Sequence, residues 1–127
     1  MLARRLLQVN LVTSIVIAIL FTAFPERAAA LMGLATGPAT RVIVQYFGAT
    51  HVAFAVLIWL ALRSREQYLL HMLVISFFAG DTVGTVVLLI AQLQGLLGAS
   101  GWWLVVGSLF FALSYGYLTI SRRWETP

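Results

Sequence analysis

The chain has 127 residues, of which 61% are hydrophobic and only 9% are charged. Soluble domains carry about 25% charged residues, so a chain this apolar lacks the polar side chains to cover its own surface in water. Its net charge of +4 comes from eight arginines without any lysine. The arginines stand at the ends of apolar runs, which indicates membrane orientation rather than nucleic-acid binding. Cysteine is absent, which excludes disulfides, thiolate metal sites and a cysteine nucleophile.

Four apolar runs are each long enough to cross a hydrocarbon core, which takes about 20 helical residues. The predicted spans are residues 6–24, 42–62, 69–90 and 102–120. Lipid gives the backbone no hydrogen bonds, so each span must be a helix or part of a closed barrel, and the alternation typical of barrel strands is absent. The sequence therefore predicts an all-α integral membrane four-helix bundle, one domain over residues 1–127. Short connections predict that the last three spans are antiparallel neighbours.

The first connection, residues 25–40, is the longest. Residues 28–35 are predicted to form a short interfacial helix with Leu31, Met32 and Leu34 directed at lipid. The three alanines at residues 28–30 also resemble a signal-peptide cleavage site. However, the apolar run before them exceeds the usual length of about 7–15 residues, and Glu26 and Arg27 disfavour cleavage, so we expect a retained first span.

The arginines predict the orientation of the spans. With the N-terminus inside, the inner segments carry six arginines and the outer segments carry two. The inner six are Arg4, Arg5, Arg63, Arg65, Arg122 and Arg123, and the outer two are Arg27 and Arg41. Because positive residues concentrate on the cytoplasmic side, we expect both termini in the cytoplasm and a multi-pass protein of the bacterial inner membrane.

Two ionisable residues lie near the centres of adjacent spans. His51 is 14 or 15 residues before the turn near residue 65, and Asp81 is 15 or 16 residues after it. At about 1.5 Å per helical residue, the two residues lie at nearly the same depth, which predicts an intramembrane polar pair. A charge at the bilayer centre costs at least about 2.5–3.5 kcal/mol. Pairing would lower that cost, and the pair could either fix the helix register or handle a proton.

Further polar residues could form a seam around this pair. The predicted members are Thr85, Gln92, Ser108, Tyr115 and Ser14, with Asn10 and Thr13 also available on the first span. Ordinary interhelical hydrogen bonding, worth about 0.6 kcal/mol per contact, explains each hydroxyl taken singly. Gly80 and Gly84 form a small-xxx-small pair that would allow a second backbone to approach closely.

The sequence contains no phosphate loop, no metal-ligand cluster and no nucleophile elbow. One Asp–His pair is too little for a catalytic site, so no enzyme activity, metal or cofactor is predicted. His51 could still be a single axial ligand to a haem or a chlorin. Its walls would be Phe47, Phe54, Phe77 and Phe78.

The plan of the chain resembles small bacterial membrane proteins of the DoxX-like kind. The likeness rests on PER after the first span, the run RVIVQYFGATHVAFAVLIWLALR, a glycine-bearing third span and SGWWLVVG at the fourth. It covers most of the chain but is architectural, so no functional residue is transferred. The resemblance implies a quinone-linked redox assembly as one setting.

Three functions remain open from the sequence. The first is an accessory or scaffold subunit that packs against a larger membrane complex, redox or photosynthetic. The second is a proton-coupled transporter that uses Asp81 and His51 at the midplane as a homo-oligomer. The third is a redox accessory protein in contact with a quinone or pigment. The expected partners are the lipid bilayer and other membrane subunits or further copies of the chain, and not nucleic acid.

Overall fold

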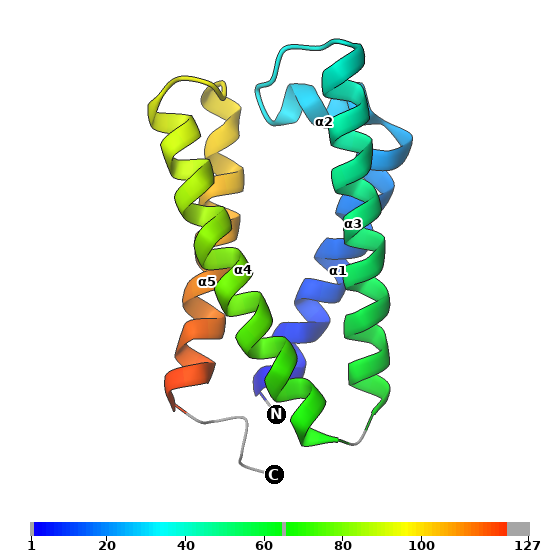
Figure 1. The fold of residues 1–127 in the computed structure, drawn as a ribbon, viewed down its shortest axis with the longest axis vertical. Helices are drawn as coiled ribbons and strands as arrows, with labels where there is room; N and C mark the ends of the chain where they lie inside the picture. Colours follow the sequence, from blue (N-terminus) through cyan, green and yellow to red (C-terminus); the bar gives the residue numbers. More distant parts are fainter. Residues whose placement is uncertain (1, 65, 122–127) are drawn as a thin grey trace.

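The computed structural model describes residues 2–64 and 66–121, and throughout these ranges the regular structure is helical (Figure 1). The elements in chain order are α1 (Leu2–Ala23), α2 (Pro25–Leu31), α3 (Pro38–Arg63), α4 (Gln67–Leu93), the 3-10 turn η1 (Ala99–Gly101) and α5 (Trp102–Ser121). Arg65, Arg122 and Arg123, used above for the orientation, lie outside the described residues.

Four of the helices are long and apolar enough to cross a membrane. The prediction of an all-helical chain with four such spans is therefore confirmed. Helices α1, α3 and α4 begin earlier than the predicted spans, because residues at the membrane surface continue the helix beyond the hydrocarbon core, whereas α5 begins at Trp102 as predicted. For example, α3 starts at Pro38, whose fixed φ suits the first turn and whose missing N–H is not needed there.

The four long helices form two antiparallel pairs, α1 with α3 and α4 with α5 (Figure 1). Helices α3 and α4 follow each other closely in sequence, but they diverge from their connecting turn and touch little beyond it. The expectation of three consecutive neighbours therefore fails between α3 and α4. One reason is Gly48, where an added Cβ would lie 2.6 Å from Thr22 Oγ1 and 2.9 Å from Thr22 N. This glycine allows the backbone of α1 to approach α3 closely.

The two pairs meet at the terminal end, which we define as the end holding the start of α1, the α3–α4 turn and the end of α5. A core cluster there draws on all four long helices; its buried members are Ala3, Leu7, Ile58, Ala61, Leu70, Val74, Tyr115 and Leu118. Arg4 closes this end by donating from Nη1 to Leu62 O at 2.9 Å and from Nη2 to Ser64 O at 3.1 Å. These carbonyls belong to the end of α3, where the helix cannot satisfy them itself.

At the opposite, loop end, α2 and the α4–α5 connection bring the pairs together again. A second buried cluster packs α2 against α1 and α3; its members are Phe21, Ala28, Ala29, Met32 and Val44. The α4–α5 connection reaches across at Gly98, whose N–H donates to Gly33 O at 3.2 Å. Trp103 Nε1 donates to Leu31 O at 2.7 Å. The loop end is therefore joined by one backbone hydrogen bond between two loops, by the side chain of Trp103, and by Leu104 of α5, which packs against the second cluster.

The short helix of the first connection begins at Pro25 rather than at residue 28. A proline at N1 and Glu26 in the first turn favour this start. Met32 is only 8% exposed and Leu34 packs against the loop-end cluster, so these two side chains face protein rather than lipid. Leu31 alone of the three is exposed, at 46%.

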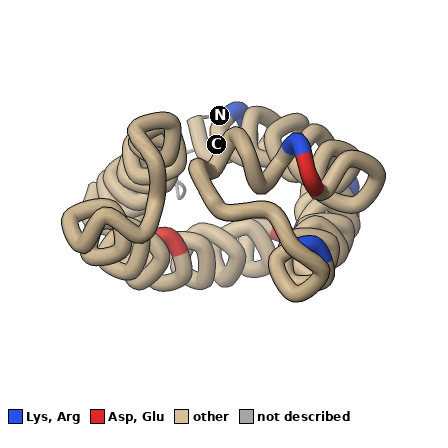
Figure 2. Tube along the Cα trace, turned by 90° about the horizontal axis from the view of Figure 1, so that it is seen from above, with Lys and Arg blue, Asp and Glu red and all other residues tan. Residues whose placement is uncertain are grey.

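Charge is scarce along the four spans. Seen from above, few positions of the trace carry an acidic or basic residue (Figure 2). The described arginines all lie in α2 or at helix ends; they are Arg4, Arg5, Arg27, Arg41 and Arg63. Asp81, in contrast, lies in the interior of α4.

Candidate functional site

The two hydroxyls predicted near Asp81 meet at its backbone. Thr85 Oγ1 donates to Asp81 O at 2.6 Å, and Ser108 Oγ on α5 donates to the same carbonyl at 3.2 Å. The two hydroxyl oxygens lie 2.7 Å apart. This three-centre contact is a polar bond between α4 and α5 of the kind that holds transmembrane helices together. It engages the main chain of Asp81 and leaves the carboxylate unused.

The carboxylate of Asp81 is the unusual group of the span. Asp81 lies on the partly buried seam of α4 that also contains Val74, Phe78, Thr85 and Gln92. Its Oδ2 is fully enclosed, and among residues 2–64 and 66–121 it has no hydrogen-bond partner. Buried polar groups are nearly always bonded, and an isolated carboxylate is the costliest to leave alone. Such a group marks a place where a proton or a ligand is expected.

His51 is not joined to Asp81 by a hydrogen bond or ion pair within the described residues. Its Nδ1 lies 2.9 Å from Phe47 O, one turn earlier on α3. The ring packs between Phe47 and Phe54, with centroid distances of 4.5 and 5.5 Å. Counting residues puts the two at nearly the same depth, but α3 and α4 diverge above their turn (Figure 1), so depth alone does not predict that the side chains meet. A joint role in proton handling stays a prediction.

A second polar cluster joins α1 to α5. Asn10 Nδ2 donates to the phenol oxygen of Tyr115 at 2.7 Å, and Ser14 Oγ donates to Asn10 Oδ1 at 3.3 Å. Tyr115 is fully buried, and Asn10 and Ser14 are 9% and 2% exposed. The pair Asn10–Tyr115 thus forms a buried polar link between the two helix pairs, next to the terminal-end core.

Aromatic rings continue this link across to α3. Phe77 stacks on Tyr115 at 5.6 Å with an interplanar angle of 25°, and it meets Phe54 edge-on at 5.8 Å. Phe54 in turn contacts His51. We call Phe54, Phe77 and Tyr115 the aromatic floor, because these rings connect α3, α4 and α5 on the terminal-end side of Asp81. Phe77 lies four residues before Asp81, on the same face of α4.

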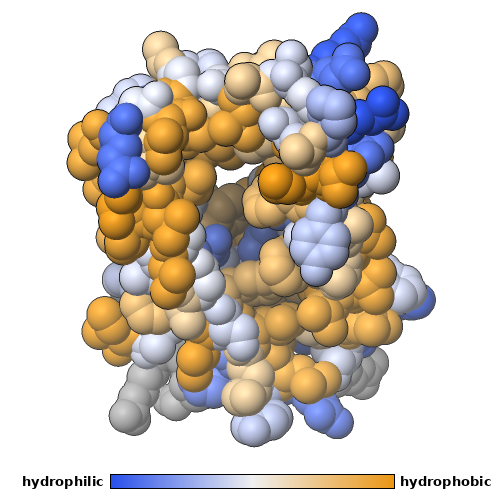
Figure 3. All heavy atoms as spheres, turned by 45° about the horizontal axis from the view of Figure 1, so that its top comes forward, coloured by the Kyte–Doolittle hydropathy of each residue, from blue (hydrophilic) through white to orange (hydrophobic). Residues whose placement is uncertain are grey.

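Between the aromatic floor and the loop-end contacts, the surface of the molecule is hollowed. Figure 3 shows this hollow between the two helix pairs, with hydrophobic side chains around its mouth and hydrophilic atoms at its back. Because α3 and α4 diverge (Figure 1), the hollow opens sideways, toward the region that lipid would occupy. The partly buried seam of α4, which carries Asp81, is the face that this helix turns toward the rest of the molecule.

The other predicted positions have structural surroundings of their own. Gln92 lies at the loop end, where its Nε2 donates to Gly98 O at 3.2 Å and so holds the α4–α5 connection. A Cβ added at Gly80 would meet nothing within 4 Å, and one at Gly84 would meet only Ser108 Oγ at 3.7 Å. Closer backbone approaches are found at Gly48, between Gly33 and Gly98, and between Gly101 and Met32 O.

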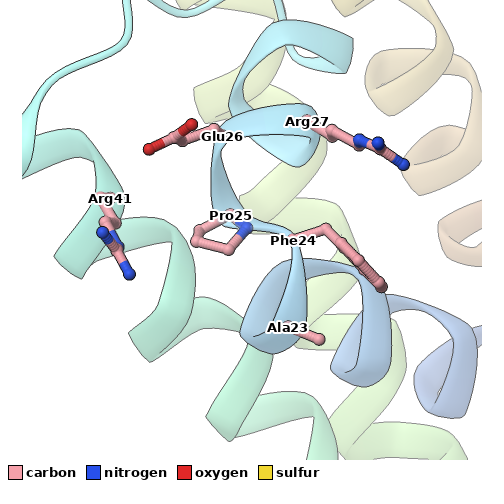
Figure 4. Close-up of a pocket in the computed structure, with 6 residues that line it drawn as sticks. All are labelled: Ala23, Phe24, Pro25, Glu26, Arg27 and Arg41. Atoms are coloured by element: carbon pink, nitrogen blue, oxygen red, sulfur yellow. The ribbon is translucent and has the colours of Figure 1, made fainter.

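A shallow pocket of about 270 Å³ lies at the loop end, around the start of α2. It is lined by Ala23, Phe24, Pro25, Glu26, Arg27 and Arg41 (Figure 4). Glu26 and Arg27 point in opposite directions from α2, and the guanidinium of Arg27 lies 5.6 Å from the Phe24 ring. The charged groups therefore do not converge on a common point, and the pocket lacks the arrangement of a specific site.

The chemistry available at the midplane is thus one carboxylate, several hydroxyls and a set of aromatic rings. Over residues 2–64 and 66–121, no group of three or more His, Cys, Asp and Glu side chains could hold a metal ion. This set lacks a nucleophile activated by a base, and it lacks the paired acids of hydrolytic sites. It suits binding or proton exchange. No protein-family model, curated protein or solved structure matches the chain.

Proposed function

We propose that the chain is a small multi-pass subunit of a larger assembly in the cytoplasmic membrane of a bacterium, with both termini in the cytoplasm. The observation that carries this proposal is how little of the fourth helix the chain itself covers. Of the 27 residues of α4, only Leu70, Val74 and Thr85 are buried. Lipid can cover an apolar face, but a partner helix covers it with specific packing.

Gly80 supports a partner on α4. The residue is exposed, and open space surrounds the position of its missing Cβ. Beside it, Val83 and Val87 are 65% and 59% exposed. A glycine in a helix interior is unfavourable by about 1 kcal/mol relative to alanine, and no contact among residues 2–64 and 66–121 offsets that cost. A second helix that packs against Gly80 would do so.

The test is to purify the chain from its own membranes in a mild detergent and to identify co-migrating proteins by mass spectrometry. We expect one larger membrane protein in a fixed ratio. A visible absorption spectrum of the same fraction reports a haem or chlorin, which the resemblance to DoxX-like proteins makes worth measuring.

Gly80→Leu sharpens this test. Because open space surrounds Gly80, the variant should fold and should gain helix propensity, yet it should lose the partner. Val106→Leu is the matched control, since Val106 on α5 is 62% exposed and the change also adds volume. A partner that remains bound to Gly80→Leu would contradict the proposed packing face, and a chain that purifies without any partner would contradict the subunit role.

A small proton-coupled carrier is the second candidate. It is favoured by the unpaired carboxylate of Asp81 beside a hollow that opens toward lipid. Intramembrane acids commonly mark substrate and proton pathways. A colourless chain that purifies alone or as a homodimer would favour this candidate.

A further inference from the structure

The hollow between the two helix pairs has a chemical character that neither proposal above specifies. Asp81 lies on the partly buried seam of α4, and its Oδ2 is enclosed without a hydrogen-bond partner among residues 2–64 and 66–121. The hydroxyls of Thr85 and Ser108 are directed at the Asp81 backbone carbonyl. The carboxylate charge is therefore left for a group that comes from outside the chain.

No positive side chain of the described residues is placed to supply that group. The described arginines lie at helix ends or in α2, and Arg4 is already bonded to the carbonyls at the end of α3. His51 is occupied at Nδ1 by Phe47 O. The span interior therefore has a site for one negative charge and no matching positive charge.

The surroundings of Asp81 favour an organic cation over a metal ion. Calcium and magnesium need about six or more oxygen ligands, including several carboxylates or waters, and Asp81 is the single acid of α4. Phe77, one turn away on the same face, stacks on Tyr115 and meets Phe54. Aromatic faces next to a carboxylate are the surroundings that recognise alkyl- and arylammonium-like groups, because the ring quadrupole attracts a cation that has shed its water.

The route of entry also selects for apolar molecules. The hollow opens where α3 and α4 diverge, toward the lipid region (Figures 1 and 3). Exposed apolar side chains stand on both of these helices; examples are Val52 at 51% and Val86 at 53%. A ligand that reaches Asp81 from the side must first dissolve in the hydrocarbon core.

We propose that the hollow is a binding site for a lipophilic organic cation, whose charge lies against the Asp81 carboxylate and whose apolar body rests on Phe54 and Phe77, the partly exposed rings of the aromatic floor. This site would give the carrier candidate its substrate class. Binding itself requires neither transport nor a partner subunit. A chain that binds without transporting therefore retains the site and loses only the carrier function.

The experiment measures binding of tetraphenylphosphonium to the purified full-length chain in detergent micelles by equilibrium dialysis. Tetraphenylborate is the matched probe, since it has nearly the same size and shape and the opposite charge. We expect saturable binding of about one tetraphenylphosphonium per chain, because the hollow holds one carboxylate, and only partitioning into micelles for tetraphenylborate. Equal behaviour of the two probes would overturn the proposal.

Asp81→Asn should weaken tetraphenylphosphonium binding by at least about tenfold, the ratio set by 1.4 kcal/mol. Glu66→Gln is its control, because Glu66 lies in the α3–α4 turn and its loss should leave binding unchanged. If Asp81→Asn does not fold, Phe77→Leu tests the site instead. Loss of one aromatic face weakens the binding of a cation by about two- to thirtyfold. Phe110→Leu, at a 53% exposed position on α5, should have no effect. Unchanged binding in a folded Asp81→Asn or in Phe77→Leu would reject the site.

Uptake of the same probe into liposomes, counted as the excess over protein-free liposomes because a lipophilic cation also crosses the bilayer by itself, separates the two claims. If Asp81→Asn loses both binding and uptake, the result supports a carrier that works through this site. Binding without uptake in the natural chain supports the site and contradicts the carrier.

Discussion

The two ends of the molecule are closed by different kinds of contact. At the terminal end, side chains from all four long helices interlock around Leu7, Ile58 and Tyr115, which are completely buried. At the loop end, the helix pairs are joined through loops, by a backbone hydrogen bond between Gly98 and Gly33 and by Trp103. The terminal end therefore depends on side-chain packing over four helices. At the loop end, a close contact between two glycines stands beside the side-chain contacts of Trp103 and Leu104.

This difference suggests which end can open. Side-chain packing over four helices is cooperative and is lost only with the fold. A contact between two loops contributes less and can break by itself. If the hollow admits a ligand, the loop end is the part that can separate while the terminal end holds the helix pairs together.

The largest expected effect is on the terminal-end core. Leu7→Ala removes a fully buried side chain that packs in a cluster of four helices, so we expect a loss of about 3–5 kcal/mol of unfolding free energy. Ile120→Ala is the matched control, since Ile120 is 82% exposed on α5 and should change stability by less than about 0.5 kcal/mol. Unfolding in mixed micelles, titrated with SDS and followed by tryptophan fluorescence, measures both. Similar losses in both variants would contradict a core at this end.

The next effect tests the loop end, where two glycines have nearly the same backbone. Gly33 has φ +71° and Gly95 has φ +70°, in the left-handed region that side chains disfavour. A Cβ on Gly33 would overlap the backbone of Gly98, whereas one on Gly95 would meet nothing within 4 Å. Gly95→Ala should therefore cost only the conformational term of about 1–2 kcal/mol.

Gly33→Ala should lower the unfolding free energy by about 2–4 kcal/mol, because the overlap with Gly98 adds to the cost of a side chain in the left-handed region. It should also shift the fluorescence of Trp103, whose indole bonds to Leu31 O beside this contact. The same SDS titration gives the energies. The shift is measured as the emission maximum in a folded background in which the other three tryptophans are replaced by phenylalanine. Equal losses of unfolding free energy in the two variants would mean that a Cβ at Gly33 does not clash with Gly98.

The sequence predicts the number and nature of the spans well, because lipid imposes length and apolarity on each helix separately. It predicts less about which helices pair. The depths of His51 and Asp81 follow from counting residues along two helices, but their lateral separation depends on where α3 packs. Gly48, inside the second apolar run, was the available signal, since a glycine in a span allows a close neighbour. The sequence alone does not say that this neighbour is α1.

The polar seam shows the same division. Thr85 and Ser108 were expected on one seam, and the structure brings their hydroxyls to 2.7 Å. Gln92 shares the face of Asp81 but stands far along α4, so it bonds the loop end. A helical wheel shows on which face of a helix a residue lies. It does not show which residues of other helices lie at the same height along the bundle and can therefore contact it. The loop contact between Gly33 and Gly98 joins residues 65 positions apart, and no local pattern signals it.

The smallest expected effect concerns the buried polar link between the helix pairs. Tyr115→Phe keeps the ring that stacks on Phe77, but it removes the hydroxyl that accepts from Asn10. Bonds between transmembrane helices are worth about 0.6 kcal/mol on average, and an unsatisfied buried amide adds to the loss, so about 1 kcal/mol is expected. Tyr46→Phe, at a 72% exposed position, controls for the change of residue type. If Asn10 finds another partner in Tyr115→Phe, no unfolding free energy will be lost. The bond would then contribute nothing to the closure of the terminal end. If the loss appears and Asn10→Ala adds nothing to it, the two groups act as one bond that ties α1 to α5 beneath the hollow.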